Sequence, residues 1–237
     1  MLFRSFTFKI NNPATQYSIS KIEIDCVIFN FEGESLKVLL VKQEDKDGNF
    51  ELANDYIKAG ETISSTAHNI LRKYIGTDHF FLEQLKAFSY PSPSSSQEDI
   101  AIGYYAMVKR DINDLENDDF NADVAWIGIN EISGLSDKHK VIVDYSLKEL
   151  RKNICKSAIG FNLLPEKFTL LQVMHLYEEI LGIEINKSNF RRKILQMGLV
   201  NDSNEKEKAV SHRAAKFYSV NLQQHELLAQ RELNFNF

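Results

Sequence analysis

The stretch from Leu52 to Thr77 contains side chains that could act on a small molecule. Gly60 breaks the chain, Glu61 follows, and apolar residues from Ile63 onward then recur at the spacing of a helix that Gly76 is predicted to end. Carboxylate oxygens are the ligands that Mg²⁺ prefers, whereas the ammonium group of a lysine repels a cation, and Lys73 lies within this stretch. The stretch therefore predicts neither a catalytic residue nor a metal site, and it predicts no cofactor.

A second set of chemically capable side chains is basic and lies near the C-terminus. Lys187, Asn189, Arg191, Arg192 and Lys193 form the polar face of a predicted helix whose other face is apolar. Arginine can pair with guanine or phosphate, and asparagine can pair with adenine, so this face is predicted to bind DNA. Four further DNA-binding candidates lie on or beside a predicted β-hairpin, namely Lys208, His212, Arg213 and Lys216. The alternative is a solvated basic face in a protein-interaction adaptor.

The secondary-structure elements of the N-terminal part must position the side chains of the Leu52 to Thr77 stretch. Lys42 to Phe50 is interpreted as a charged loop and Tyr90 to Glu98 as a polar loop, and Leu52 begins a further loop that leads into the helix. Periodicity predicts strands over Ile22–Phe31, Ser35–Val41, Phe81–Phe88, Asp99–Val108 and Ala122–Ile127, with helices over Glu131–Leu135 and Lys138–Leu150. Strands interleaved with helices in this way predict an α/β fold, an α/β/α sandwich around a mixed sheet.

The C-terminal elements must position the basic set. Phe168 to Gly182 is predicted to be a helix with a capping box formed by Thr169 and Gln172 and with Gly182 as its C-terminal stop. A second helix, with Asn186 as its N-cap, is predicted from Lys187 to Met197, followed by two short strands around a polar tip. This order predicts a smaller winged helix-turn-helix, so we predict a domain over residues 1–150 and a second domain over residues 151–237.

The composition agrees with two folded units. The chain has 237 residues, of which 43% are hydrophobic, which is enough for packed cores. Residues 1–150 hold 15 Lys and Arg against 24 Asp and Glu, whereas residues 151–237 hold 13 against 9, so the basic half is the one expected to meet a polyanion. No apolar run could span a bilayer, and no signal peptide is expected. The prediction is therefore a cytoplasmic protein without a membrane partner.

Two motifs resemble those of a known family. Leu52 to Thr77 resembles a Nudix box in which Asp55 stands at the first glycine and Asn69 at the arginine. Three glutamate positions of that box carry Ile70, Lys73 and Tyr74. The segment NFRRK, followed by a wing that ends in R-x-A-x-x-Y, resembles the C-terminal domain of Nudix-related transcriptional regulators. The resemblance extends roughly from Ile22 to Val220.

This resemblance implies a homodimeric repressor that binds a palindromic operator in double-stranded DNA. It also implies that an inactive Nudix domain binds a small-molecule effector, a sugar or a molecule similar to ADP-ribose. Candidate effector-binding residues are Asp25, Lys42, Tyr56, Lys58 and Glu61. The alternative function is an active Nudix pyrophosphohydrolase that acts on nucleoside diphosphates similar to ADP-ribose.

Three of these candidates have a second interpretation. Asp25 lies within an apolar strand, so it could be hydrogen-bonded at a cleft or dimer interface, or lie at a strand edge. Lys42 could face the ligand, as a basic residue does in Nudix domains of this kind, or face solvent. Glu61 could bind the ligand, or be a first-turn glutamate that the helix dipole favours.

Overall fold

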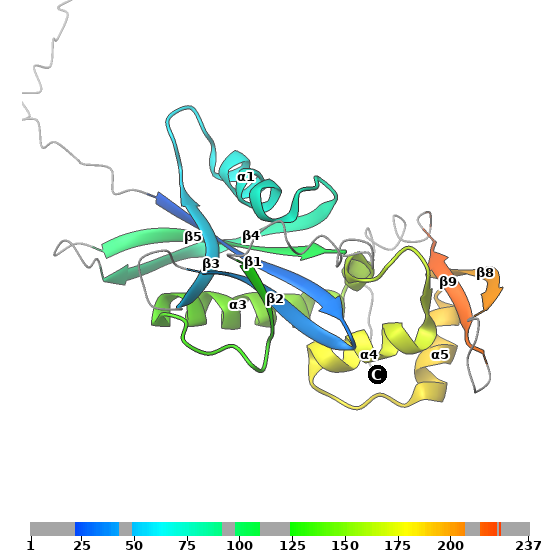
Figure 1. The fold of residues 1–237 in the computed structure, drawn as a ribbon. Coiled ribbons are helices and arrows are strands. Elements are labelled where there is room, and N and C mark those ends of the chain that lie inside the picture. Colours follow the sequence, from blue (N-terminus) through cyan, green and yellow to red (C-terminus); the bar gives the residue numbers. More distant parts are fainter. Residues whose placement is uncertain are drawn as a thin grey trace, which may run out of the picture.

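The computed structural model describes residues 22–42, 49–91, 98–109, 124–206, 214–221 and 223. A six-stranded sheet lies between helix α1 and helix α3, and a second, smaller unit lies at one end of this sandwich (Figure 1). The predicted α/β/α sandwich with a mixed sheet and a C-terminal winged helix is confirmed.

The large sheet is built around strand β1. Its strand order is β4-β5-β1-β3-β2-β6. Strand β1 pairs in parallel with β5, whereas the other pairings among the described strands of this sheet are antiparallel. The strands are β1 (Ile22–Glu32), β2 (Ser35–Lys42), β3 (Phe50–Tyr56), β4 (Phe80–Pro91), β5 (Glu98–Val108) and β6 (Val124–Gly128). Because successive side chains of a strand point to opposite faces, each strand contributes to both sides of the sandwich.

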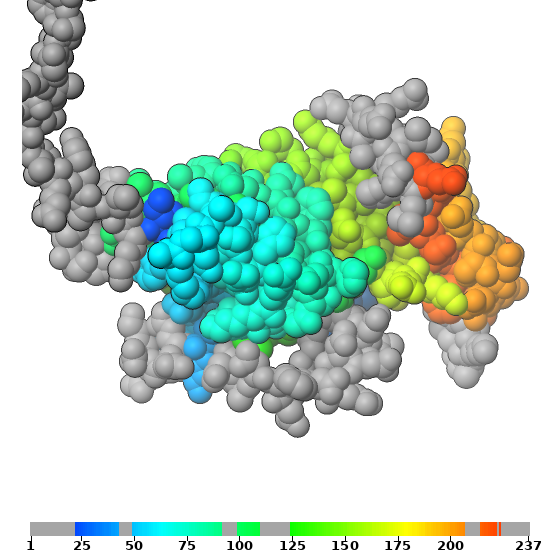
Figure 2. Space-filling model, turned by 90° about the horizontal axis from the view of Figure 1, so that it is seen from above, coloured from blue at the N-terminus to red at the C-terminus, as the bar shows by residue number. Residues whose placement is uncertain are grey.

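Helix α1 (Ile63–Ile75) covers one face of the sheet, and its ends are set by local chemistry. Thr62 is the N-cap and forms a capping box with Ser65, which satisfies two backbone donors at the start of the helix. Gly76 ends the helix in the left-handed conformation at φ 71°, which glycine adopts without steric cost. Figure 2, which views this face, shows α1 and the edge strand β4 in the foreground and the C-terminal strands at the far end.

Helix α3 (Asp137–Ile154) covers the opposite face and is the longest helix of the described chain. Its 18 residues span about 27 Å at the helical rise of 1.5 Å per residue. The predicted boundary between residues 150 and 151 falls inside this helix, and the division into two domains stays a prediction.

The two faces of the sheet have different cores. Ile24, Cys26 and Ile28 of β1 pack with Ala67 and Leu71 of α1 in a closed cluster. Val27 and Phe29 of β1 belong to a larger cluster that also contains apolar side chains of α3 and continues into the C-terminal unit. The α3 face therefore shares a continuous apolar core with the C-terminal helices.

The C-terminal unit is a three-element helical core with a small sheet. A short 3-10 helix (Ala158–Leu163) precedes β7 (Phe168–Thr169), α4 (Leu170–Leu181), α5 (Lys187–Gln196), β8 (Val200–Lys206) and β9 (Lys216–Val220). Strand β9 lies between β7 and β8. The predicted capping box of Thr169 and Gln172 is confirmed, as is Gly182 in the left-handed conformation after α4.

Four sequence expectations were wrong in detail. Residues Phe50–Tyr56, interpreted as loop, form β3, because β1 and β2 pair with both of its edges despite its polar composition. Glu131–Leu135 is a turn and not a helix, and Gly134 within it adopts φ 77°. Phe168–Thr169 pairs with β9 as β7, so α4 begins two residues later than predicted. Tyr90 and Pro91, assigned to a polar loop, belong to β4.

Candidate DNA-binding surface and effector site

Helix α5 is positioned by its N-cap and by an aromatic anchor. Asn186 accepts a hydrogen bond from the backbone N–H of Asn189, as predicted for an N-cap. Phe190 and Ile194 are buried, and the Phe190 ring meets the Tyr177 ring of α4 edge-on at 5.9 Å between centroids. This packing fixes which side of α5 faces solvent.

The outward side of α5 carries most of the predicted basic set. Lys187, Arg191 and Arg192 are exposed, whereas Asn189 and Lys193 are half-buried. The Arg192 guanidinium donates to Asn189 Oδ1 at 2.8 Å, which holds the two side chains together. A guanidinium beside an amide offers donors and an acceptor to the edge of a base pair.

Sequence reasoning missed the neutral members of this surface. Ser188, Leu195 and Gln196 are exposed, and Leu195 retains 41% of its accessible area. Positions 188, 192 and 195 follow the three- and four-residue spacing of one helix face, so the same periodicity could have found them. An apolar side chain on such a face can contact the methyl group of thymine.

The wing places one predicted residue beside α5. Lys216 of β9 forms an ion pair with Asp202 of β8 at 2.6 Å. The hydrogen bond and charge of Asp202 raise the pKa of Lys216, and the nearby Arg191 charge opposes this effect. Lys216 and Arg191 therefore lie close enough to interact. Lys208, His212 and Arg213 lie outside the described residues.

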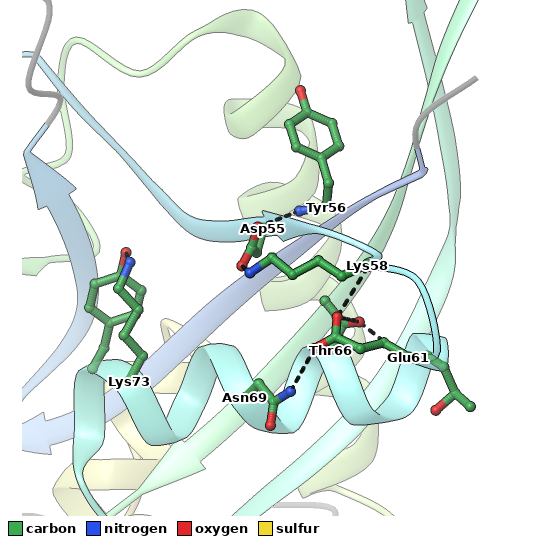
Figure 3. A network of polar contacts seen from close by, with 9 residues as sticks. Asp55, Tyr56, Lys58, Glu61, Thr66, Asn69 and Lys73 are labelled. Carbon is green, nitrogen blue, oxygen red and sulfur yellow. Dashed lines mark hydrogen bonds and ion pairs between the residues drawn. The ribbon is translucent and has the colours of Figure 1, made fainter. Parts of the chain in front are cut away.

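On the α1 face, Glu61 holds the loop before the helix. Its carboxylate accepts from the backbone N–H of Lys58 at 3.1 Å, from Thr66 Oγ1 at 3.0 Å and from Asn69 Nδ2 at 3.0 Å (Figure 3). These hydrogen bonds lower the pKa of Glu61, that from Lys58 most. Glu61 precedes the N-cap Thr62, so its interpretation as a first-turn glutamate was wrong.

Two lysines lie near the Asp55 carboxylate on this face. Lys58 Nζ pairs with Asp55 Oδ2 at 2.6 Å, and Lys73 Nζ donates to the Tyr74 hydroxyl at 3.0 Å. Burial raises the pKa of Asp55, but hydrogen bonds from Lys58 and from the Tyr56 backbone, with the charges of both lysines, lower it overall. The ionised Asp55 is thus matched by ammonium groups of the protein itself.

Tyr56 and Asp25 lie on the other face of the sheet. Asp55 pairs with Ile24, whose side chain packs under α1, whereas Tyr56 pairs with Glu23 and Asn54 with Asp25. Figure 3 shows the Tyr56 ring pointing away from α1, opposite to Asp55. The five candidate effector residues are therefore not brought together. Their role stays a prediction.

Lys42 is also separate from the other candidates. It is exposed at the end of β2 and pairs with Phe50, at the opposite end of β3 from Tyr56. At about 3.4 Å per residue, the length of β3 puts roughly 20 Å between those two strand ends. Lys42 thus lies beyond the reach of a small ligand held near Tyr56.

The α3 face contains a buried polar cluster that the sequence did not predict as a unit. We call it the β1–α3 polar cluster and define it as Glu23, Asp25, Lys138, His139 and Tyr90. Lys138 Nζ lies 2.9 Å from Glu23 and 3.1 Å from Asp25, and the Tyr90 hydroxyl donates to Glu23 at 2.5 Å. Burial lowers the pKa of Lys138, but the two carboxylates raise it overall.

The last turn of α3 connects the sheet to the C-terminal unit. Asn153 Nδ2 donates to the buried Tyr105 hydroxyl at 3.1 Å, and Arg151 Nε donates to the Ile180 carbonyl at the end of α4 at 2.7 Å. A second junction lies at the β1–β2 turn, where Glu34 Oε1 is 2.7 Å from His175 Nδ1 of α4. Helix α4 is thus held from two sides by the sheet domain.

Residues 160–220 match the model of the NrtR DNA-binding winged helix domain. The C-terminal unit is an NrtR-type winged helix. The chain is 21% identical over 232 residues to the ADPR responsive transcriptional repressor NtrR of Acinetobacter baylyi, covering 93% of this chain and 90% of that protein.

Solved structures confirm the architecture around the NrtR-type winged helix. Shewanella oneidensis NrtR, crystallised with a 27mer DNA, has a TM-score of 0.74 and 23% identity, covering 86% of this chain and 95% of that chain. A MutT/nudix family protein of Enterococcus faecalis has a TM-score of 0.65 and 16% identity, covering 87% and 90%. The resemblance to Nudix-related transcriptional regulators, expected from the sequence, is therefore confirmed.

Proposed function

We propose that this chain is a DNA-binding transcriptional repressor whose Nudix domain binds a sugar or nucleotide-sugar effector and thereby controls operator binding. The observation that carries the proposal is the exposed face of α5, where Arg191 and Arg192 project from a helix anchored by Phe190 within an NrtR-type winged helix. The S. oneidensis relative was crystallised with DNA, and the A. baylyi relative is named an ADPR responsive repressor. Both names support the proposal.

We further propose that the repressor acts in the cytoplasm as a homodimer on a palindromic operator. A dimer of winged helices contacts two half-sites separated by about 34–36 Å, or a multiple of that distance. An effector that favours one dimer geometry lowers operator affinity by its differential binding to the two geometries. The contacts of α4 with both α3 and the β1–β2 turn support such coupling, because they tie the winged helix to the sheet domain.

The DNA-binding part of the proposal is tested with an operator obtained by selection from random DNA. Arg192→Ala should weaken binding to this operator by roughly 1–3 kcal/mol, the cost of losing a bidentate base contact. The matched control is Lys148→Ala, which removes an exposed basic side chain from α3. Wild-type binding should also fall steeply with salt, since phosphate contacts release counterions. Wild-type affinity in both Arg191→Ala and Arg192→Ala would show that α5 does not bind the DNA.

An active hydrolase is the second function, and the site chemistry opposes it. The Nudix fold implies Mg²⁺ held by carboxylates, but here Glu61 accepts three protein hydrogen bonds and Asp55 pairs with Lys58. Lys73 stands on the same helix where the box expects a glutamate. These residues do not fit a divalent cation, because they supply ammonium groups where oxygen ligands are needed.

Catalytic silence is therefore expected. Purified protein with Mg²⁺ or Mn²⁺ should not cleave ADP-ribose above the rate of a blank, as followed by chromatography of the nucleotide products. Turnover that disappears in Glu61→Gln would establish the hydrolase instead.

A further inference from the structure

The β1–α3 polar cluster is buried in a way that a purely structural ion pair does not require. Asp25 is 0% exposed, and Glu23 and His139 are also buried. Asp25 Oδ2 lies 3.1 Å from Lys138 Nζ, but both ring nitrogens of His139 make no hydrogen bond with the described residues, although His139 Nε2 lies 3.3 Å from Asp25 Oδ1. Buried polar atoms are nearly always paired, so unpaired ones point to a missing partner.

The charges of the cluster are also unequal. Glu23 and Asp25 are two carboxylates, and Lys138 is the ammonium group that lies within ion-pair distance of both. The two carboxylates and this ammonium together carry a formal charge of minus one. A buried carboxylate without full compensation is stabilised by donors that approach it, which neutral hydroxyl groups can supply.

Aromatic side chains border the cluster toward solvent. The Tyr56 side chain is 44% exposed and lies within the electrostatic reach of Glu23 and Lys138, since burial and the Glu23 charge raise the pKa of Tyr56. The Tyr90 ring lies 5.0 Å from Lys138 Nζ and is half-buried. Two aromatic rings beside paired carboxylates provide an apolar surface next to hydrogen-bond acceptors.

This chemistry favours one class of ligand. Phosphate groups would meet two carboxylates and a single ammonium, so a phosphorylated group is repelled here. A neutral polyhydroxylated group instead presents hydroxyl donors to Glu23 and Asp25 and acceptors to Lys138, while its C–H faces pack on tyrosine rings. The pentose of a free sugar and the ribose of a nucleotide sugar share this chemistry.

We propose that the β1–α3 polar cluster, together with Tyr56, binds the sugar moiety of the effector, on the opposite face of the sheet from the Nudix-box helix α1. This inference rests on the proposed function, because it places the effector site of the repressor. The site adjoins the first turn of α3, and the last turn of the same helix bonds to α4 through Arg151. A ligand that reorders Lys138 and His139 therefore acts directly on the helix that holds the winged helix.

Two variants test the site without removing its structural core. Tyr56→Ala truncates an exposed ring, and Glu23→Gln keeps the side-chain volume while leaving Asp25 to pair with Lys138. The matched control is Glu32→Gln on the same strand, where the carboxylate pairs with Lys37 at 2.8 Å outside the cluster. Lys58→Met tests the opposite face. A thermal unfolding experiment on each of the four variants is the control for correct folding.

The probes are free L-arabinose, D-xylose and D-ribose in one arm and ADP-ribose in the other, each titrated by calorimetry. The affinity for a probe that the wild type binds should fall about tenfold or more in Tyr56→Ala and Glu23→Gln, because each loses a partner of a ligand hydroxyl or ring face. Glu32→Gln and Lys58→Met should bind that probe as the wild type does. Binding of the free pentoses alone would identify a free sugar as the ligand. Binding of ADP-ribose as well would show that a nucleotide sugar can supply the same group.

Two results would overturn this site. One is wild-type affinity in both Tyr56→Ala and Glu23→Gln with a loss in Lys58→Met, which would put the ligand beside α1. The other is a wild type that binds no probe, which would reject a sugar ligand. The proposed function fails separately, when operator affinity measured with saturating probe equals that without it although the probe binds at the β1–α3 polar cluster.

Discussion

The two faces of the six-stranded sheet both carry carboxylate–lysine pairs, but in opposite environments. On the α1 face, Asp55 and Lys58 pair at 2.6 Å with much of both side chains exposed to solvent. On the α3 face, Lys138 meets Asp25 and Glu23 at 3.1 and 2.9 Å under near-complete burial. The first arrangement is a surface feature that solvent screens, and the second is an internal site where every unpaired charge is costly.

The apolar cores on the two faces of the sheet also differ. The cluster under α1 is closed, whereas the cluster under α3 continues through the 3-10 helix into α4 and α5. The family motif therefore lies on the face that has no shared core with the winged helix. The helix of the Nudix-like box and the apolar core shared with the DNA-binding unit thus lie on opposite faces of one sheet.

The largest expected effect is the difference in stability between a variant of the buried Lys138 and a variant of the exposed Lys58. Lys138→Met leaves Glu23 and Asp25 buried without a cation, so the free energy of unfolding should fall by about 3–5 kcal/mol in urea titrations. Lys58→Met breaks only the exposed pair with Asp55 and should leave the urea midpoint unchanged. Equal midpoints for the two variants would contradict the contrast between the faces.

A smaller effect is expected where α3 meets the winged helix. Arg151→Ala removes the hydrogen bond to the Ile180 carbonyl, which is the last-turn acceptor that a cation stabilises. We expect the coupling between effector and operator binding to fall by roughly 0.5–2 kcal/mol, while effector affinity in the absence of DNA stays constant. The control is Lys152→Ala, whose partner Glu149 lies on α3 itself. Unchanged coupling in Arg151→Ala would exclude this contact as part of the route.

The smallest effect on effector affinity is expected from the addition or removal of Mg²⁺. Because Lys58 and Lys73 stand near Asp55 where a Nudix enzyme needs oxygen ligands, the effector should bind with the same affinity in Mg²⁺ and in EDTA. Parallel calorimetric titrations measure this. Tighter binding in Mg²⁺ would mean that the α1 face still holds a cation together with the ligand.

The sequence by itself determined the features that depend on neighbouring residues. The capping box at Thr169, the N-cap at Asn186 and the glycine stops after α1 and α4 were predicted because each is a contact within a few residues. The outward face of α5 followed from the burial of Phe190 and Ile194 at helical spacing. Such contacts need no knowledge of the rest of the fold.

Only the tertiary structure decided which polar residues meet. Asp25 and Lys138 are separated by more than a hundred residues, and α3 brings them together across β1. Strand β3 was missed because the polar segment around Asn54 becomes a strand only when β1 and β2 pair with its two edges. Asp55 and Tyr56 are adjacent in sequence, yet the pleat of β3 sends them to opposite faces and so to different sites.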